Sequence, residues 1–321
     1  IANLLVLTVI YKIKRKLAPL EKRGKQFRKR HILSALLKAS VPISANRLVM
    51  SILSAAELIL IPARLASGGL EYKSSMEVFG RLTGMALPLI TFPSLVTNSL
   101  ATALVPAISE SVSLKKYRLV NTRISKSIRI TIILGIIFTA LFINYPDQIG
   151  NLLYRRENIG EILYSLSYSC VFIYMQQTLA GVLNGLGKQA LILRNTVIGS
   201  LMRIAAVLFL VPVYGIRSYI WGLIASYLLT AVLDLSVIHK VTGLVFDLRE
   251  WLFKPCLAGI AMVLTGKYIY YFFTIFKYSE TITVMLTIAA FVIISVLLMT
   301  FTGVIGIKEV LSISGLKNNE K

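Results

Sequence analysis

The chain has 321 residues, of which 56% are hydrophobic and only 15% charged, and its mean hydropathy is +0.75. A soluble chain carries roughly 25% charged residues, so this composition excludes a soluble domain, a disordered chain and a coiled coil. Lys and Arg number 35 against 14 Asp and Glu, a net charge of +21. Cytoplasmic loops of membrane proteins accumulate such cations. We therefore expect an all-α, polytopic transmembrane helix bundle with no nucleic-acid partner.

The chain begins with a short apolar segment, residues 1–11, that stops at a run of lysines. Eleven helical residues span about 16 Å, roughly half of the hydrocarbon core of a bilayer. The segment lacks the cleavage site of a signal peptide. We interpret it as the truncated end of a transmembrane helix, followed by a basic cytoplasmic loop over residues 12–34. The sequence is then expected to be the C-terminal part of a longer protein.

Further apolar segments are each long enough to cross a membrane and are nearly continuous, which excludes the alternating strands of a membrane barrel. They lie near residues 36–63, 79–106, 127–145, 161–183, 190–213, 215–238, 253–274 and 281–302. One set of alternate loops holds 24 Lys and Arg residues, and the opposite set holds seven. By the positive-inside rule, the 12–34 loop and the C-terminus are cytoplasmic.

Charged residues inside the spans are the first candidates for a functional site. They are the bases Lys38, Arg47, Arg81 and Arg203 and the acids Glu57 and Asp234. A charge at mid-bilayer costs at least roughly 2.5–3.5 kcal/mol, so each needs a partner, a route to the interface or a polar cavity. Lys38 and Arg81 lie near span ends, where snorkelling competes with a functional role. We place Arg203 in a cavity, and Arg47, which is a little nearer a span end, fits a cavity as well as a route to the interface; Arg203, Arg47 and Arg81 are thus the candidate cavity bases, whereas the two acids either neutralise arginines or bind a coupling ion.

The segment 79–106 has the features of a cavity wall. Pro88 and Pro93 each remove a backbone donor and bend a helix. Four polar residues follow at spacings of 3, 4 and 4, which places them on one face of a continuous helix: Thr91, Ser94, Asn98 and Thr102. Freed carbonyls and hydroxyls in such a wall can meet water or substrate, although helix–helix hydrogen bonding explains the same stripe. A second stripe, Ser226, Thr230 and Asp234, fits tight packing as well as a pathway.

Catalytic and metal-binding patterns are absent from the sequence. His31 and His239 lie at loop edges, and no phosphate-binding loop, zinc motif or CxxC pair occurs. Cys170 and Cys256 lie in apolar stretches and form no redox motif. We therefore expect no enzyme, no metal and no cofactor. Any transport would then depend on an ion gradient, the membrane potential or a substrate gradient, with Na⁺ or H⁺ as the candidate coupling ion.

Several stretches carry a resemblance to a known family. They are PISANRLVMSILSAAELILIPARL from Pro42, GRLTGMALPLITFPSLVTNSLATALVPAISE from Gly80, GVLNGLGKQ from Gly181 and LMRIAAVLFLVPVYGI from Leu201. These residues resemble the stage V sporulation protein B family, which is part of the oligosaccharidyl-lipid and multidrug exporter superfamily. The resemblance covers nearly the whole chain. Arg81 departs from it, because an uncharged polar residue is expected there.

The resemblance implies two six-helix lobes around a central cavity, plus two extra helices. This chain then contains a six-helix C-terminal lobe over 35–239, the two additional helices over 240–304 and a cytoplasmic tail over 305–321. The missing N-terminal lobe is the expected partner. The implied activity is a flippase for a lipid-linked peptidoglycan or polysaccharide precursor in spore cortex synthesis, located in the cell membrane. Arginines would grip the pyrophosphate, and the polar stripe would bind the sugars.

Three alternatives remain open on the sequence alone. A cation-coupled multidrug exporter shares the architecture but calls for buried carboxylates, and here four in-span bases outnumber two acids. A membrane-embedded enzyme acting on the same lipid would need a large extramembrane loop. A non-transporting scaffold in cell-wall synthesis would need neither buried carboxylates nor a large extramembrane loop.

Overall fold

A computed structural model describes residues 29–155, 157–245, 247 and 249–304 of the chain. The chain divides into two compact units, residues 1–41 and residues 42–321, and the helix α2 (Lys29–Ser67) runs across the boundary between them. The architecture described below is that of the second unit. The expectations for residues 1–11 and for the tail 305–321 lie outside the described residues.

The described residues form helices and turns, as the composition predicts. After α2 the elements are α3 (Tyr72–Gly80), η1 (Arg81–Ala86), α4 (Leu87–Thr91), α5 (Ser94–Ser113), α6 (Tyr117–Asn144), α7 (Pro146–Tyr154), α8 (Gly160–Ser167), α9 (Cys170–Gly185), α10 (Gln189–Phe209), α11 (Val211–Tyr214), α12 (Ile216–Thr242), η2 (Arg249–Phe253), α13 (Lys254–Thr274) and α14 (Glu280–Phe301). Within them, six helices are long and apolar enough to cross a membrane, or seven if one bent pair forms a single span. The predicted polytopic all-α bundle is confirmed.

The predicted span 79–106 is a bent pair of helices. α3, η1 and α4 run into α5 with a bend of 57° between Thr91 and Ser94. The cause is in the sequence: Pro93 has no N–H to donate at the break, and the π-helical η1 precedes Pro88. Pro106 lies inside α5, which continues through it. The prediction of a bend was correct, but the prediction of one polar face through the bend was wrong.

Two other predicted boundaries differ from the structure. The predicted span 161–183 is interrupted at Tyr168 and Ser169, where α8 ends and α9 begins, and the backbone N–H of Ser169 bonds to the carbonyl of Leu166. The basic loops are also shorter than predicted, because α6 begins at Tyr117, within the basic segment 115–129. Likewise α2 begins at Lys29, within the predicted loop 12–34.

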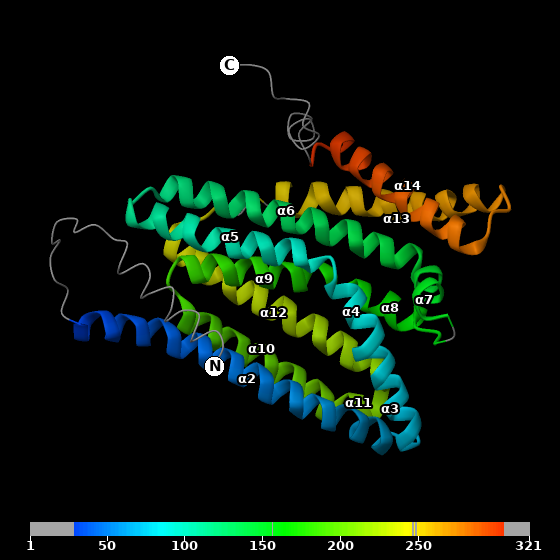
Figure 1. Ribbon diagram of the computed structural model, residues 1–321, viewed down its shortest axis with the longest axis horizontal. Helices are drawn as coiled ribbons and strands as arrows, with labels where there is room; N and C mark the ends of the chain where they lie inside the picture. Colours follow the sequence, from blue (N-terminus) through cyan, green and yellow to red (C-terminus); the bar gives the residue numbers. More distant parts are fainter. Residues whose placement is uncertain (1–28, 156, 246, 248, 305–321) are drawn as a thin grey trace, which may run out of the picture. The chain divides into compact units, whose positions relative to one another are not determined.

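Small residues set the closest helix contacts. In Figure 1, α5, α9 and α6 run side by side, and α9 carries a GxxxG pattern on the face that meets α5. A Cβ on Gly181 would lie 2.7 Å from the backbone of Ala101, and one on Gly185 would lie 2.9 Å from Ile108. These glycines let the two backbones approach, and larger side chains would separate α5 from α9.

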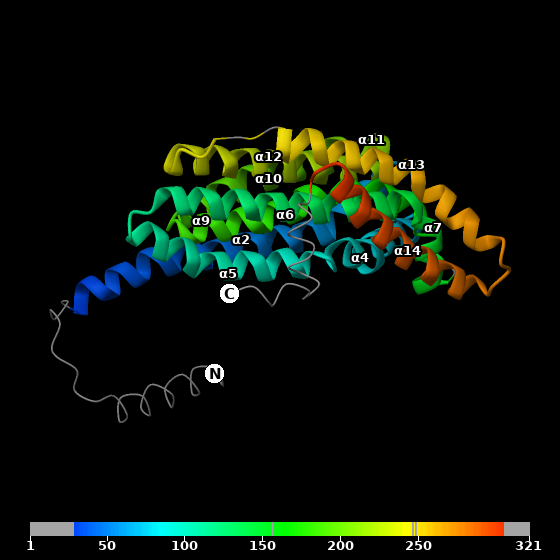
Figure 2. The same cartoon turned by 90° about the horizontal axis from the view of Figure 1, so that it is seen from above.

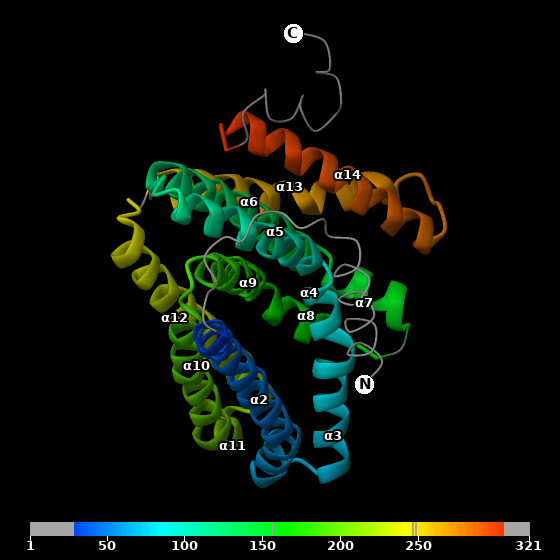
Figure 3. The ribbon, with the colours of Figure 1, turned by 60° about the vertical axis from the view of Figure 1, so that its left-hand side comes forward.

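The pair α10 and α12 packs in the same way, and Figure 3 shows the two helices running alongside each other. A Cβ on Gly199 would meet the Thr230 hydroxyl at 2.2 Å, and one on Gly222 would meet Ala206 at 2.4 Å. The Ser226 hydroxyl donates to the Gly199 carbonyl at 2.7 Å. The stripe on α12 is therefore a packing surface in its Ser226 and Thr230 positions, as one of its two interpretations predicted.

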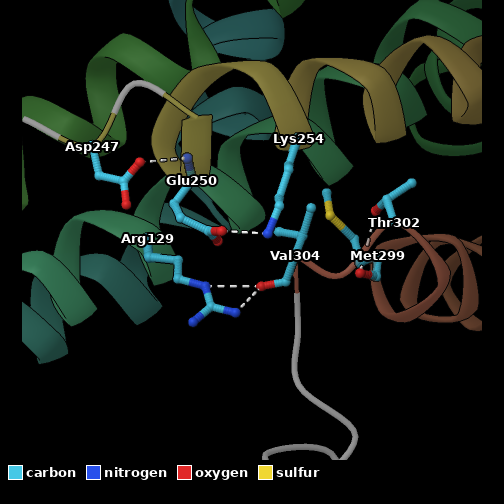
Figure 4. A network of polar contacts seen from close by, with 7 residues as sticks. All are labelled: Arg129, Asp247, Glu250, Lys254, Met299, Thr302 and Val304. Atoms are coloured by element: carbon cyan, nitrogen blue, oxygen red, sulfur yellow. Dashed lines mark hydrogen bonds and ion pairs between the residues drawn. The ribbon is translucent and has the colours of Figure 1, made fainter.

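The C-terminal hairpin α13–α14 packs against α6, as Figure 2 shows. Midway along the hairpin, the buried Tyr145 hydroxyl donates to the Gly266 carbonyl at 2.6 Å, and the ring meets Phe291 edge to face at 5.5 Å. Beyond the end of α14, Arg129 of α6 donates to the Val304 carbonyl (Figure 4). Two polar contacts, one from α6 and one from the residue that follows it, thus hold the hairpin.

The connection that leads into α13 carries its own polar network. Figure 4 shows the Asp247 carboxylate accepting from the backbone N–H of Glu250 at 3.1 Å, while Glu250 pairs with Lys254 one helical turn later. The Asp247 bond is the kind of contact that satisfies an otherwise unpaired N–H at the start of a helix. Buried Trp251 packs into the same cluster as Ile124 and Ile128 of α6. The two additional helices are therefore attached to the lobe at their first turn as well.

Candidate functional site

The first polar centre inside the bundle is an ion pair between α10 and α2. Arg203 Nε contacts Glu57 Oε1, with side chains only 7% and 13% exposed. The Tyr219 hydroxyl donates to Glu57 Oε2 at 3.3 Å, and Tyr227 of α12 lies beside Arg203. The sequence left open whether Glu57 neutralises an arginine, and the structure shows that it does. Arg203, which we expected in a cavity, is buried in this pair.

The second centre joins α10 to α12 around Asp234, which is 1% exposed. Asn195 Nδ2 donates to Asp234 Oδ1 at 2.8 Å, and Asn195 Oδ1 in turn accepts from the guanidinium of Arg194 at 3.0 and 3.1 Å. Asp234 thus sits at the buried end of a chain that leads through an amide to a cation. It does not meet Arg203.

The polar residues predicted along 79–106 are divided between two environments. Ser94 is buried, and its hydroxyl accepts from Gln177 Nε2 of α9 at 3.1 Å; Thr97 donates to Gln177 Oε1 at 3.0 Å. Asn98 and Thr102 are exposed, and the Thr102 hydroxyl bonds to the Asn98 carbonyl within its own helix at 2.9 Å. Thr91 bonds the carbonyl of Leu87 in α4 at 2.9 Å. The bend at Pro93 separates Thr91 from the other three residues, whereas Ser94 differs from Asn98 and Thr102 in burial along the same helix, α5.

Gln177 and a serine stripe on α2 were missed in the sequence. Gln177 falls four residues before Gly181 and eight before Gly185. At this spacing the three residues share the face of α9 that meets α5, so the sequence alone could have predicted its position. On α2, serines flank Arg47 at helical spacings of 3, 4 and 3 and are all exposed: Ser44, Arg47, Ser51 and Ser54. Counting only charged residues in that span concealed the stripe.

Arg81 lies away from the buried centres. Its Nε pairs with Glu157 Oε2 at 3.2 Å, and both side chains are partly exposed, at 34% and 44%. Arg47 is exposed, and Lys38 lies among residues whose side chains are outside the described set. Two of the four in-span bases are therefore neutralised by acids, which reduces the surplus of positive charge inferred from the sequence.

The described residues contain no group of three or more His, Cys, Asp or Glu side chains that could hold a metal ion. Cys170 is buried and Cys256 exposed, and both are free thiols. On the apolar helices α2 and α5, exposed hydroxyls and amides and the exposed Arg47 are available to a ligand. Such groups bind a ligand by hydrogen bonds and charge.

Together, the apolar helices and the polar groups held between them define a multi-pass, all-α membrane protein. Residues 83–208 match the MatE family. The chain is 27% identical over 259 residues to stage V sporulation protein B of Bacillus subtilis (strain 168), covering 78% of this chain and 49% of that protein. These matches confirm the predicted resemblance to the stage V sporulation protein B family.

Two further relatives come from the same organism. Sporulation protein YkvU is 28% identical over 165 residues, which is 51% of this chain and 36% of the relative. The uncharacterized membrane protein YabM is 25% identical over 240 residues, which is 74% of this chain and 42% of the relative. No solved structure matches the chain. The chain spans about half the length, or less, of the curated relatives it matches.

Proposed function

We propose that the protein is part of a membrane transporter that moves a lipid-linked peptidoglycan or polysaccharide precursor across the cytoplasmic membrane. The observation that carries the proposal is the exposed polar stripe on α2. An 18-residue window within residues 44–67 has a mean hydropathy of 1.8, which suits a membrane span, and toward the start of this segment Arg47 and its flanking serines are exposed. An exposed arginine is costly against lipid, and a polar neighbour on this face would remove that cost.

The chemistry of the exposed groups fits such a precursor. Its pyrophosphate calls for a cation, and the planar guanidinium of Arg47 can bind phosphate oxygens in bidentate fashion. Its sugars call for donors and acceptors, which Asn98, Ser99 and Thr102 provide on the exposed face of α5. Arg203 is not part of this set, because Glu57 already binds it. The proposed substrate contacts are therefore Arg47 and the α5 amide and hydroxyls.

The relatives support the biological setting. Two of them are named as sporulation proteins, which fits a role in building the wall of a spore. The proposed driving force is a Na⁺ or H⁺ gradient, and Asp234 is the carboxylate proposed to respond to it, since Glu57 is occupied by Arg203. Alternating access would follow from rocking this lobe against a second lobe around the substrate.

Binding of lipid II to the purified protein tests the proposal. Native mass spectrometry would compare wild type, Arg47→Gln, Asn98→Leu and the control Arg217→Gln, whose arginine is exposed but paired with Glu161. We expect the wild type and the control to retain lipid II. Arg47→Gln should retain about tenfold less, because a hydrogen bond to a charged group contributes at least that factor, and Asn98→Leu should retain a few-fold less, because its bonds to the sugars are uncharged.

Other outcomes would change the assignment. Retention that is unchanged in both variants would remove α2 and α5 from the substrate site. Binding of a cationic drug without lipid II would favour the multidrug exporter. Binding of neither would favour the scaffold.

Orientation is part of the same proposal, with the C-terminus in the cytoplasm. Single cysteines at Lys240 and at Lys277, placed in a Cys256→Ser background, should be labelled from opposite sides by a membrane-impermeant maleimide. Only the Lys277 position should react in intact cells. Labelling of the Lys240 position in intact cells would reverse the topology.

A further inference from the structure

A polar pocket of about 440 Å³ lies between α7 and the first turn of α14. From the α7 side it is lined by Gln148, Asn151, Leu152 and Arg155, and from α14 by Glu280, Thr281 and Val284. The α7 residues are spaced 3, 1 and 3 apart, so one face of this amphipathic helix forms the wall. The pocket lies apart from the residues proposed above to contact the transported substrate.

The helix ends around the pocket are those expected near lipid headgroups. The membrane-length helix α6 ends at Asn144, just before α7, and α14 begins at Glu280, so both walls stand at ends of membrane-length helices. The end of α13 and the connection to α14 expose a group of aromatic rings: Tyr271, Phe272, Phe276 and Tyr278. Aromatic side chains gather at the interface between lipid and water, which supports the same depth for the pocket.

Opposite charges occupy opposite walls without neutralising each other. Arg155 stands at the end of α7 and Glu280 at the start of α14, and both are exposed. In the described part of the chain, neither takes part in an ion pair, although Arg81, Arg217 and Lys254 each have one. A pocket with a separated cation and anion is complementary to a ligand that carries both charges.

The remaining polar groups of the pocket indicate the chemical nature of the ligand's cation and anion. Gln148 Oε1 is buried and has no hydrogen-bond partner, so it calls for a donor. No side chain caps the first N–H groups of α14, where Thr281 also places a hydroxyl, so this end favours an anion that accepts hydrogen bonds. Below them, Leu152 and the buried Val284 are apolar.

We propose that this pocket binds the phosphoethanolamine headgroup of a membrane phospholipid. The phosphate lies against Arg155, Thr281 and the first turn of α14, and the ammonium donates to Glu280 and Gln148. The acyl chains continue along the exposed apolar face of α14, at Met285 and Leu286. An ammonium has three N–H donors, whereas a choline has none and a glycerol headgroup has no cation. The pocket therefore selects ethanolamine, and the lipid bridges the lobe to the extra helices whether or not the transport proposal holds.

Native mass spectrometry of the purified protein tests this with three phospholipids that share palmitoyl and oleoyl chains and differ in headgroup: ethanolamine, choline and glycerol. We expect preferential retention of the ethanolamine lipid, and displacement of it by soluble glycerophosphoethanolamine. Arg155→Gln and Glu280→Gln should each lower its retention about tenfold. Glu280→Gln should also abolish the preference over the glycerol lipid. Lys267→Gln, an exposed cation on α13 outside the pocket, is the matched control and should change nothing.

Several results would overturn the proposal. Equal retention of the three lipids would show that only the acyl chains are bound. Failure of soluble glycerophosphoethanolamine to displace the ethanolamine lipid would show the same. Unchanged retention in both pocket variants would place the lipid elsewhere. Retention of N-acetylglucosamine in place of the lipid would make the pocket a carbohydrate site. Circular dichroism and thermal melting of each variant separate these outcomes from misfolding. Gln148→Leu removes the unpaired amide and leaves the charges of Arg155 and Glu280 in place.

Discussion

Replacing Arg203 by methionine would leave the Glu57 carboxylate buried in the bundle without its cation. The Glu57 side chain is 13% exposed and would keep only the Tyr219 hydroxyl, at 3.3 Å, as a donor. Removing one partner of a buried ion pair costs about 3–5 kcal/mol, because the remaining charge is uncompensated. We expect the unfolding free energy of Arg203→Met to fall by that amount, and Glu57→Leu to behave similarly.

The double variant Glu57→Leu/Arg203→Met separates the cost of an orphaned charge from the value of the pair. Apolar replacement of a whole buried pair is often neutral or stabilising, so we expect the double variant to recover at least about 3 kcal/mol relative to the sum of the two single changes. Unfolding free energies would come from titration with SDS in mixed micelles, followed by far-ultraviolet circular dichroism.

The chain provides its own matched control in the pair Arg217–Glu161, which also joins two helices but has side chains 70% and 64% exposed. Exposed pairs contribute about 0–1 kcal/mol, so Arg217→Met should be nearly neutral. If Arg203→Met costs no more than Arg217→Met, the buried pair does not hold α2 to α10, and the reasoning fails. If the double variant is as unstable as the sum of the single variants, the loss comes from packing.

Two further changes test the packing of the lobe and of the hairpin. Gly181→Ala places a methyl group against Ala101 and should destabilise the protein by about 1–3 kcal/mol. The control Gly84→Ala meets nothing within 4 Å and should be neutral or slightly stabilising. Equal shifts of the melting temperature in the two variants would contradict the α5–α9 contact. Arg129→Gln removes the charged donor at the Val304 carbonyl and should speed amide exchange in the last turn of α14 about tenfold. Lys126→Gln, at an exposed lysine, is the control. Unchanged exchange in Arg129→Gln would show that this contact does not hold the end of α14.

The sequence predicted the class of fold because hydropathy reports membrane burial segment by segment. It also predicted the bend near Pro88 and Pro93, since a missing N–H is a local property. It could not predict that Glu57 meets Arg203, because 146 residues separate them and the periodicity of one helix does not identify its neighbour. The stripe through Thr91 and Asn98 failed for a related reason: helical spacing places residues on one face only while the helix is straight.

The structure divides the polar residues of the spans into two kinds, and the division bears on function. Asp234 and Arg203 are buried and bonded inside the lobe, so they hold α2, α10 and α12 together. Arg47, Asn98 and Thr102 are exposed on helices that are otherwise apolar. Groups of the first kind fix the lobe as one body, whereas groups of the second kind have hydrogen-bonding capacity left for something outside it. A lobe that is rigid inside and polar on an outer face suits the rocking proposed above, and the exposed set is where substitutions should alter the proposed binding without unfolding the protein.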